Sequence, residues 1–286
     1  MQAAAPRLHA LVATRAPVAA VFRRGPSGWW HVGRWDLVSG DYEPGAWLRG
    51  GLYPRRCDLS PDGTLLLAYV RKRTDAGFLE AEAPSFPDTY VTVSKLPWLF
   101  ALAAWREGST WGRGYRFVEG PPSARPFVLG DPDAGDATPL LRRYGVERHP
   151  VVQYAAERSR GWVEHPDSPP RAAGGPWDEQ RSAVLVKPRP HGPGRLVLRD
   201  AGMGVTGPSV EGRAPAFELE REGRRLALED VAWAEWDPQG RLLVATHAGK
   251  LELRDPDDAR LAVIRAHDLA ALRPLPRRAP DWAQRW

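Results

Sequence analysis

The chain has 286 residues, of which 43% are hydrophobic and 26% charged, and its formal net charge is +5. These values exclude a wholly disordered chain and leave enough apolar surface for a buried core. The 29 prolines and 28 glycines are spread along the whole sequence. They argue against long helices, because an interior proline removes a backbone donor and clashes with the preceding turn, and the 13 tryptophans favour β-structure.

Charge and cysteine usage limit the partners and the compartment. Nearly all of the positive charge is arginine, interleaved with 35 acidic residues, which is typical of a mixed, solvated surface rather than a nucleic-acid or membrane contact. The single cysteine, Cys57, excludes an internal disulfide and is expected to be a buried thiol in a strand. The apolar stretch from Leu8 to Ala13 lies between Arg7 and Arg15 and makes a poor signal-peptide core, so a cytoplasmic location without a membrane partner is expected.

The first third of the chain predicts short strands joined by tight turns. Apolar and β-branched runs alternate there with Gly, Pro, Ser and Asp clusters, and the Ser-Pro-Asp-Gly run at 60–63 has proline and glycine where a tight turn needs them. We expect strands over 20–24, 29–37, 46–48, 55–59 and 64–72.

The same order returns near the C-terminus. Residues 232–245 contain an aromatic strand, an Asp-Pro-Gln-Gly turn and a second apolar strand. A third strand is expected from Lys250 to Asp255 and a fourth from Arg260 to Ile264. Together they predict one complete four-stranded antiparallel unit.

These segments resemble WD40 repeats. The stretch from Val32 to Gly40 is similar to the third strand and following turn of a WD40 blade, where a Trp-Asp pair closes the strand, and residues 57–68 are similar to the inner strand, hairpin and second strand of the next blade. The resemblance covers about residues 19–118 and 226–265; the Gly-His pair that begins many such repeats is missing. The residues that carry it structurally are Trp35, Asp36, Ser60, Pro61, Asp62, Gly63, Asp237, Pro238 and Gly240.

The resemblance implies an all-β fold, a β-propeller of about six, within five to seven, four-stranded blades. Such blades recur about every 40 to 45 residues. The turn glycines Gly63 and Gly108 are 45 residues apart, and Gly63 and Gly240 are 177 apart, close to four periods. We expect a single domain over 1–286, with Pro-rich loop insertions near 120–150 and 164–180 and a C-terminal tail at 268–286.

Tryptophans are the candidate partner-binding residues. Strand alternation puts Trp29, His31, Gly33 and Trp35 on one face and Trp30 on the other. Packing between blades would bury both faces, so core packing is the main interpretation and a binding patch the alternative. The candidates for partner binding are Trp29, Trp30, Trp47, Trp282 and Trp286.

No motif predicts a catalytic, cofactor or metal site. The seven histidines have no zinc-ligand spacing, and nucleotide-binding glycine loops and the nucleophile-elbow motif are missing. Asp131, Asp133 and Asp136 are interpreted as a solvated loop rather than a calcium site, because the glycine and glutamate positions of an EF-hand loop are missing.

The sequence therefore favours a non-catalytic scaffold that binds a protein partner, as a subunit of a larger bacterial assembly. Two alternatives stay open. One is a propeller enzyme, a hydrolase or lyase, whose site lies at the channel mouth and which convergent carboxylates or histidines with perturbed pKa values would favour. The other is a nucleic-acid-binding subunit, with Arg71-Lys72-Arg73, Arg142-Arg143 and Arg277-Arg278 as short basic runs.

Overall fold

The structure is a computed structural model that describes residues 6–25, 28–71, 89–107, 112–119, 132–150, 152–168, 182–200 and 215–286. The predicted all-β class is confirmed, because the described chain is built from several antiparallel sheets. Its helical elements are single turns, namely α1 (Thr138–Leu141), α2 (Ala155–Arg158), η1 (Pro54–Arg56) and η5 (Asp281–Ala283). Within the described ranges, no helix is both long and apolar enough to cross a membrane.

Sheet A contains the first four strands in sequence order, each antiparallel to the next. Its third strand ends with Trp35 and Asp36, as predicted from the Trp-Asp pair. The apolar stretch after Pro6 forms the first strand, paired along its full length with the second. The strands are β1 (Arg7–Val12), β2 (Val18–Arg24), β3 (Trp29–Asp36) and β4 (Tyr42–Arg49).

Sheet B follows, with β7 and β8 at its centre. The strand β7 is apolar on both faces and almost wholly buried, which is expected of a strand covered on two sides. The members of the sheet are β5 (Gly51–Leu52), β6 (Asp58–Leu59), β7 (Leu65–Arg71), β8 (Thr89–Lys95), β9 (Ala103–Arg106) and β11 (Ala134–Gly135). The predicted turn glycine Gly108 lies outside the described residues.

Sheet C is a small hairpin-like pair, β10 (Tyr115–Glu119) with β12 (Tyr144–Arg148). The part of the expected insertion at 120–150 that is described thus carries β11, α1 and β12.

Sheets D and E complete the chain, and each is a regular antiparallel meander. Sheet E confirms the four-stranded unit predicted near the C-terminus. Sheet D contains β13 (Val163–Glu164), β14 (Ala183–Pro188), β15 (Arg195–Asp200), β16 (Ala216–Arg221) and β17 (Arg224–Ala227), and sheet E contains β18 (Val231–Trp236), β19 (Leu242–Thr246), β20 (Lys250–Arg254) and β21 (Val263–Asp268).

Two predicted strands are wrong in part. The strand expected over 55–59 is reduced to Asp58–Leu59, because Pro54–Arg56 form the 3₁₀ turn η1; Cys57 follows it and is buried as expected. The fourth strand of sheet E begins at Val263 rather than at Arg260. The carboxylate of Asp258 accepts the amides of Arg260 and Ala262, which holds this stretch in a turn.

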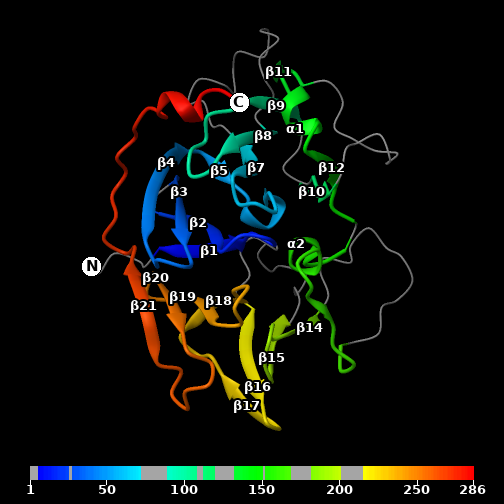
Figure 1. Ribbon diagram of the computed structural model, residues 1–286, viewed down its shortest axis with the longest axis vertical. Helices are drawn as coiled ribbons and strands as arrows, with labels where there is room; N and C mark the ends of the chain where they lie inside the picture. Colours follow the sequence, from blue (N-terminus) through cyan, green and yellow to red (C-terminus); the bar gives the residue numbers. More distant parts are fainter. Residues whose placement is uncertain are drawn as a thin grey trace.

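Three buried clusters join the sheets. One is shared by sheets A, B and C, one by sheets A and E, and one by sheets D and E. The first strand, β1, lies against β18 near the other end of the chain, and β16 lies against β18. In Figure 1 the sheets follow one another around the view in sequence order, with the blue sheet A next to the orange sheet E.

Candidate functional site

The candidate tryptophans of sheet A are mostly packing residues. The rings of Trp29 and Trp47 meet edge to face with centroids 6.5 Å apart, and His31 stacks on Trp47 at 4.6 Å. Trp30 packs against the cluster shared by sheets A, B and C, whereas Trp35 lies in the cluster shared by sheets A and E. Both faces of β3 are therefore covered, which favours core packing over an exposed recognition patch.

The other two candidates lie in the C-terminal segment. Trp282 is 47% exposed, and its carbonyl accepts a hydrogen bond from Lys95 Nζ at 3.1 Å. Trp286 is half-buried against the cluster of sheets A, B and C. The structure thus brings Trp29 and Trp47 together, and the C-terminal tail is held against the body of the molecule at its end.

The blade-motif residues form local turns. Asp36 accepts the amides of Val38 and Ser39 at 3.0 and 3.1 Å. Ser60 donates to Asp62 at 2.6 Å, and Gly63 and Gly240 have φ of +72° and +77°, which favour glycine. The carboxylate of Asp237 accepts the amides of Gln239 and Arg241 at 2.9 and 2.7 Å. Each of these contacts lies within a single turn, so they give the motif residues a structural role.

The most unusual feature of the interior is a set of buried charges, which we call the ionic network and define by Arg55, Asp58, Glu157, Arg160, Lys187 and Glu235. The side chains of these residues are at most 17% exposed. They form three ion pairs between residues far apart in sequence. A buried charge is retained at low cost only when it is paired and hydrogen-bonded, and further hydrogen bonds surround each of the three pairs.

The first pair joins β6 to the segment after α2. The carboxylate of Asp58 contacts the Arg160 guanidinium and accepts the Phe117 amide at 2.7 Å from β10. Arg160 also donates to the carbonyls of Ala156 at 3.2 Å and Val12 at 3.5 Å. One guanidinium thereby ties sheets A and B to the α2 segment.

The second pair joins η1 to α2. Glu157 lies 3.4 Å from Arg55, whose guanidinium also covers the Tyr154 ring at 5.0 Å. The Tyr154 hydroxyl and the Gln153 amide donate to Asp200, each at 2.9 Å, which extends this contact to sheet D. Burial raises the pKa of Glu157, Arg55 opposes this shift, and nearby Glu235 adds to it.

The third pair joins sheets D and E. Lys187 on β14 lies 2.7 Å from Glu235 on β18. The other contacts of Glu235 are the Trp162 indole at 3.0 Å and the Trp236 amide at 2.7 Å. Each Glu235 oxygen therefore has a donor.

Two histidines beside the ionic network are held neutral. Burial lowers the pKa of His9, and Arg55 and Arg160 lower it further. Burial also lowers the pKa of His149 to about 3, with smaller contributions from Arg160 and Arg116. Both ring nitrogens of His149 and one oxygen of Glu157 are buried without a hydrogen-bond partner. A carboxyl with a raised pKa is the type of group that serves as a general acid.

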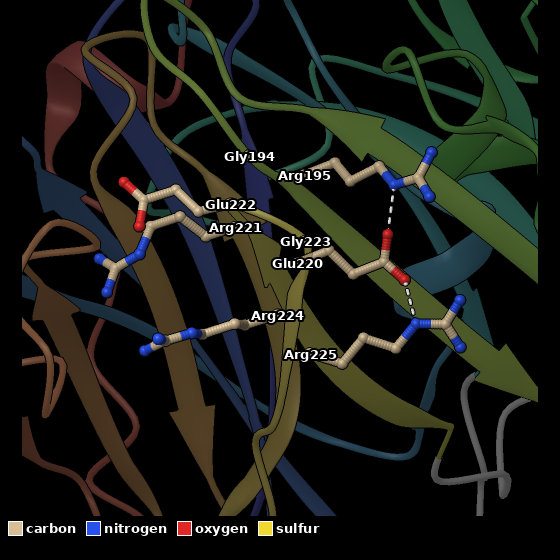
Figure 2. Close-up of a pocket in the computed structure, with 8 residues that line it drawn as sticks. All are labelled: Gly194, Arg195, Glu220, Arg221, Glu222, Gly223, Arg224 and Arg225. Atoms are coloured by element: carbon tan, nitrogen blue, oxygen red, sulfur yellow. Dashed lines mark hydrogen bonds and ion pairs between the residues drawn. The ribbon is translucent and has the colours of Figure 1, made fainter.

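A second, very different site lies at the surface of sheet D. A pocket of about 450 Å³ is lined by residues 194–195 and 220–225, at the end of the β16–β17 hairpin. Figure 2 shows that Arg195 and Arg225 both reach Glu220, at 2.5 and 2.8 Å, while Arg221, Glu222 and Arg224 lie on the other side of the hairpin. Four arginines against two glutamates make this pocket cationic.

Two acidic clusters, Asp133 with Asp136 and Asp255 with Asp257 and Asp258, have their described carboxylates held by hydrogen bonds and ion pairs. No group of three His, Cys, Asp or Glu residues in the described chain is arranged to hold a metal ion. Asp133 accepts the Arg106 amide at 2.8 Å and Asp136 accepts the Thr138 amide at 2.8 Å, and Asp131 lies outside the described residues. The Asp257 carboxylate is held by Arg189 at 2.6 and 2.9 Å.

Sequence reasoning missed both the ionic network and the cationic pocket. A signal for the first was present, because Glu235 stands between Trp233 and Trp236 in a strand that is otherwise apolar. The pocket also had a signal in the run Glu-Arg-Glu-Gly-Arg-Arg over 220–225, in which the glycine marks a two-residue hairpin.

Comparisons with known proteins place the chain in no family. No protein-family model matches it, and no curated protein matches it. Among solved structures, the crystal structure of uncharacterized protein lmo1340 from Listeria monocytogenes EGD-e aligns with a TM-score of 0.28 and 10% identity, over 92% of this chain and 84% of that chain.

Proposed function

We propose that this protein is a non-catalytic interaction module, a scaffold subunit that binds a protein partner in the bacterial cytoplasm. The observation that carries the proposal is the division of its charged groups. The charges of the ionic network are paired with one another and tie the sheets together, whereas the cationic pocket and the hairpin beside it face solvent. Recognition sites are commonly built on loops and hairpins of a rigid scaffold.

The scaffold we infer is a propeller-like ring of WD40-like blades. Contacts between A and B, B and C, A and E, and D and E support it, because in such a ring the first sheet packs on the last. Between sheets C and D the α2 segment makes an indirect connection, through Tyr154 to Asp200 of sheet D and through Arg160 to Asp58 of sheet B, which in turn accepts the Phe117 amide of sheet C. With five sheets in the described chain, the ring would stand at the lower end of the expected five to seven blades.

Isolation of the tagged protein from the cells that encode it tests this function. We expect one partner at fixed stoichiometry and reconstitution of the complex from the two purified proteins. A chain that remains monomeric, with no stoichiometric partner at any protein concentration, would contradict the proposal.

A hydrolase or lyase is the second candidate. Glu157 favours it, because its pKa is raised and one of its oxygens is unpartnered. The test is turnover of chromogenic esters, phosphates and glycosides by the wild-type protein and by Glu157→Gln, with Glu119→Gln as the exposed control. Turnover that is abolished by Glu157→Gln and preserved by Glu119→Gln would favour the enzyme. If the wild-type protein turns over none of these substrates, the interaction module stands as the proposed function. The basic runs at 142–143, between α1 and β12, and at 277–278, in the C-terminal tail, lie on separate segments, which does not favour nucleic-acid binding; residues 72 and 73 of the third run lie outside the described residues.

A further inference from the structure

The end of the β16–β17 hairpin combines a cationic pocket with an unpaired strand edge. In the described part of the chain, β17 is the last strand of sheet D and pairs only with β16. All four of its residues are exposed, including Arg224, Arg225 and Leu226, which is 43% exposed. An exposed edge presents backbone donors and acceptors that can pair with another strand.

The register fixes which backbone groups face outward. Arg221 pairs with Arg224 across the two-residue turn at 222–223, and Leu219 pairs with Leu226. In an antiparallel pair, hydrogen-bonded and non-hydrogen-bonded positions alternate, and the pair beside a two-residue turn is hydrogen-bonded. The Leu228 amide bonds the Phe217 carbonyl at 2.9 Å, which agrees with this phase. The N–H and C=O groups of Arg225 and Ala227 therefore point away from β16.

Positive charge exceeds negative charge at this edge of sheet D. Glu220 is shared between Arg195 and Arg225, so one carboxylate faces two guanidinium groups. On the other side of the hairpin, Arg221 donates to the Pro256 carbonyl, and Arg224 extends beside it (Figure 2). A cationic edge repels basic strands and complements acidic ones, and guanidinium groups bind carboxylates with two parallel hydrogen bonds.

We propose that β17 binds an acidic, extended segment of a partner protein by strand addition. Main-chain hydrogen bonds form with Arg225 and Ala227, while Arg224 and Arg225, on opposite faces of the strand, receive two adjacent acidic side chains. An apolar partner residue then meets Leu226. The inference rests on the proposed interaction function and names the chemistry of the partner.

The probe is a fluorescein-labelled octapeptide with two adjacent glutamates followed by alternating valine and threonine. Its binding is measured by fluorescence anisotropy at low salt. We expect saturable binding that weakens with salt, and loss of binding when the glutamates are replaced by lysine or when alternate peptide amides are N-methylated.

Three variants separate charge from backbone pairing. Arg224→Glu with Arg225→Glu should weaken binding at least tenfold, whereas Arg277→Glu with Arg285→Glu, which changes the net charge equally on the C-terminal segment, should leave it unchanged. Ala227→Pro removes an outward N–H that β16 does not use, and it should weaken binding at least tenfold with the melting temperature preserved.

Two results would overturn the inference. One is peptide binding that is unaffected by Ala227→Pro or absent altogether. The other is tighter binding of a single-stranded oligothymidine that requires the same arginines. If the peptide fails while the partner complex described above still forms, strand addition is lost and the interaction function stands; if that complex also fails, both are lost.

Discussion

Removing one member of a buried ion pair should be far more damaging than removing a similar exposed one. The matched substitutions are Arg160→Gln and Arg143→Gln. Arg160 pairs with Asp58, and both side chains are 8% exposed, whereas Arg143 pairs with Asp62 at 2.5 Å with side chains 54% and 34% exposed. Arg160→Gln leaves the Asp58 carboxylate buried and uncompensated, which costs about 3–5 kcal/mol, while an exposed pair contributes about 0–1 kcal/mol.

Urea denaturation followed by tryptophan fluorescence measures this difference as the free energy of unfolding. Asp58→Asn should lower the free energy of unfolding by a similar amount. The new side-chain carbonyl oxygen of Asn still accepts the Phe117 N–H, but the Arg160 charge then stays buried without a carboxylate beside it. The double variant should lose about 2 kcal/mol less than the sum of the two single variants, since neither charge is then left alone. Equal losses for Arg160→Gln and Arg143→Gln would refute a structural role for the ionic network.

Two further predictions concern pH and a turn. The folded pKa of His149 is about 3, against about 6.5 in an unfolded chain, so the unfolded state binds more protons as the pH falls below about 6.5. Stability should therefore be full above pH 6.5 and be lost progressively toward pH 3, and His149→Leu should flatten the acid limb of a pH series of urea midpoints; an unchanged slope would contradict the assignment. In the turn at 222–223, Gly223→Ala should lower the stability by about 1 kcal/mol, the backbone strain of φ +73°, because an added Cβ there has open space around it. Gly240→Ala adds a Cβ 2.2 Å from the Pro190 carbonyl oxygen and should cost about 1–3 kcal/mol more in thermal unfolding, so equal losses would exclude the close approach.

Local structure was predictable where the determining contacts lie within a few residues. The turn at Ser60 to Gly63 is closed by its own side chains and a glycine at positive φ, and all of these are visible in the sequence. The same reasoning placed Trp35 and Asp36 at the end of a strand. It failed for 55–59 and 260–264, where Pro54 and the Asp258 carboxylate favour turns over strand pairing.

The ionic network was not predictable, because its partners are far apart in the chain. Asp58 and Arg160 are separated by 102 residues, and Trp162 and Glu235 by 73. A single sequence shows that Glu235 lies in an apolar strand, but not which donor neutralises it. The pocket likewise depends on the pairing of β15 with β16, which brings Arg195 opposite Glu220.

The arrangement of the sheets is the claim on which the rest depends, and a crystal structure of the protein tests it most directly. We expect β1 of the first sheet packed against β18 of the last, with Asp58, Arg160 and Glu235 enclosed between the sheets. Two separate lobes, with these three side chains in solvent, would contradict both the ring and the scaffold function inferred from it.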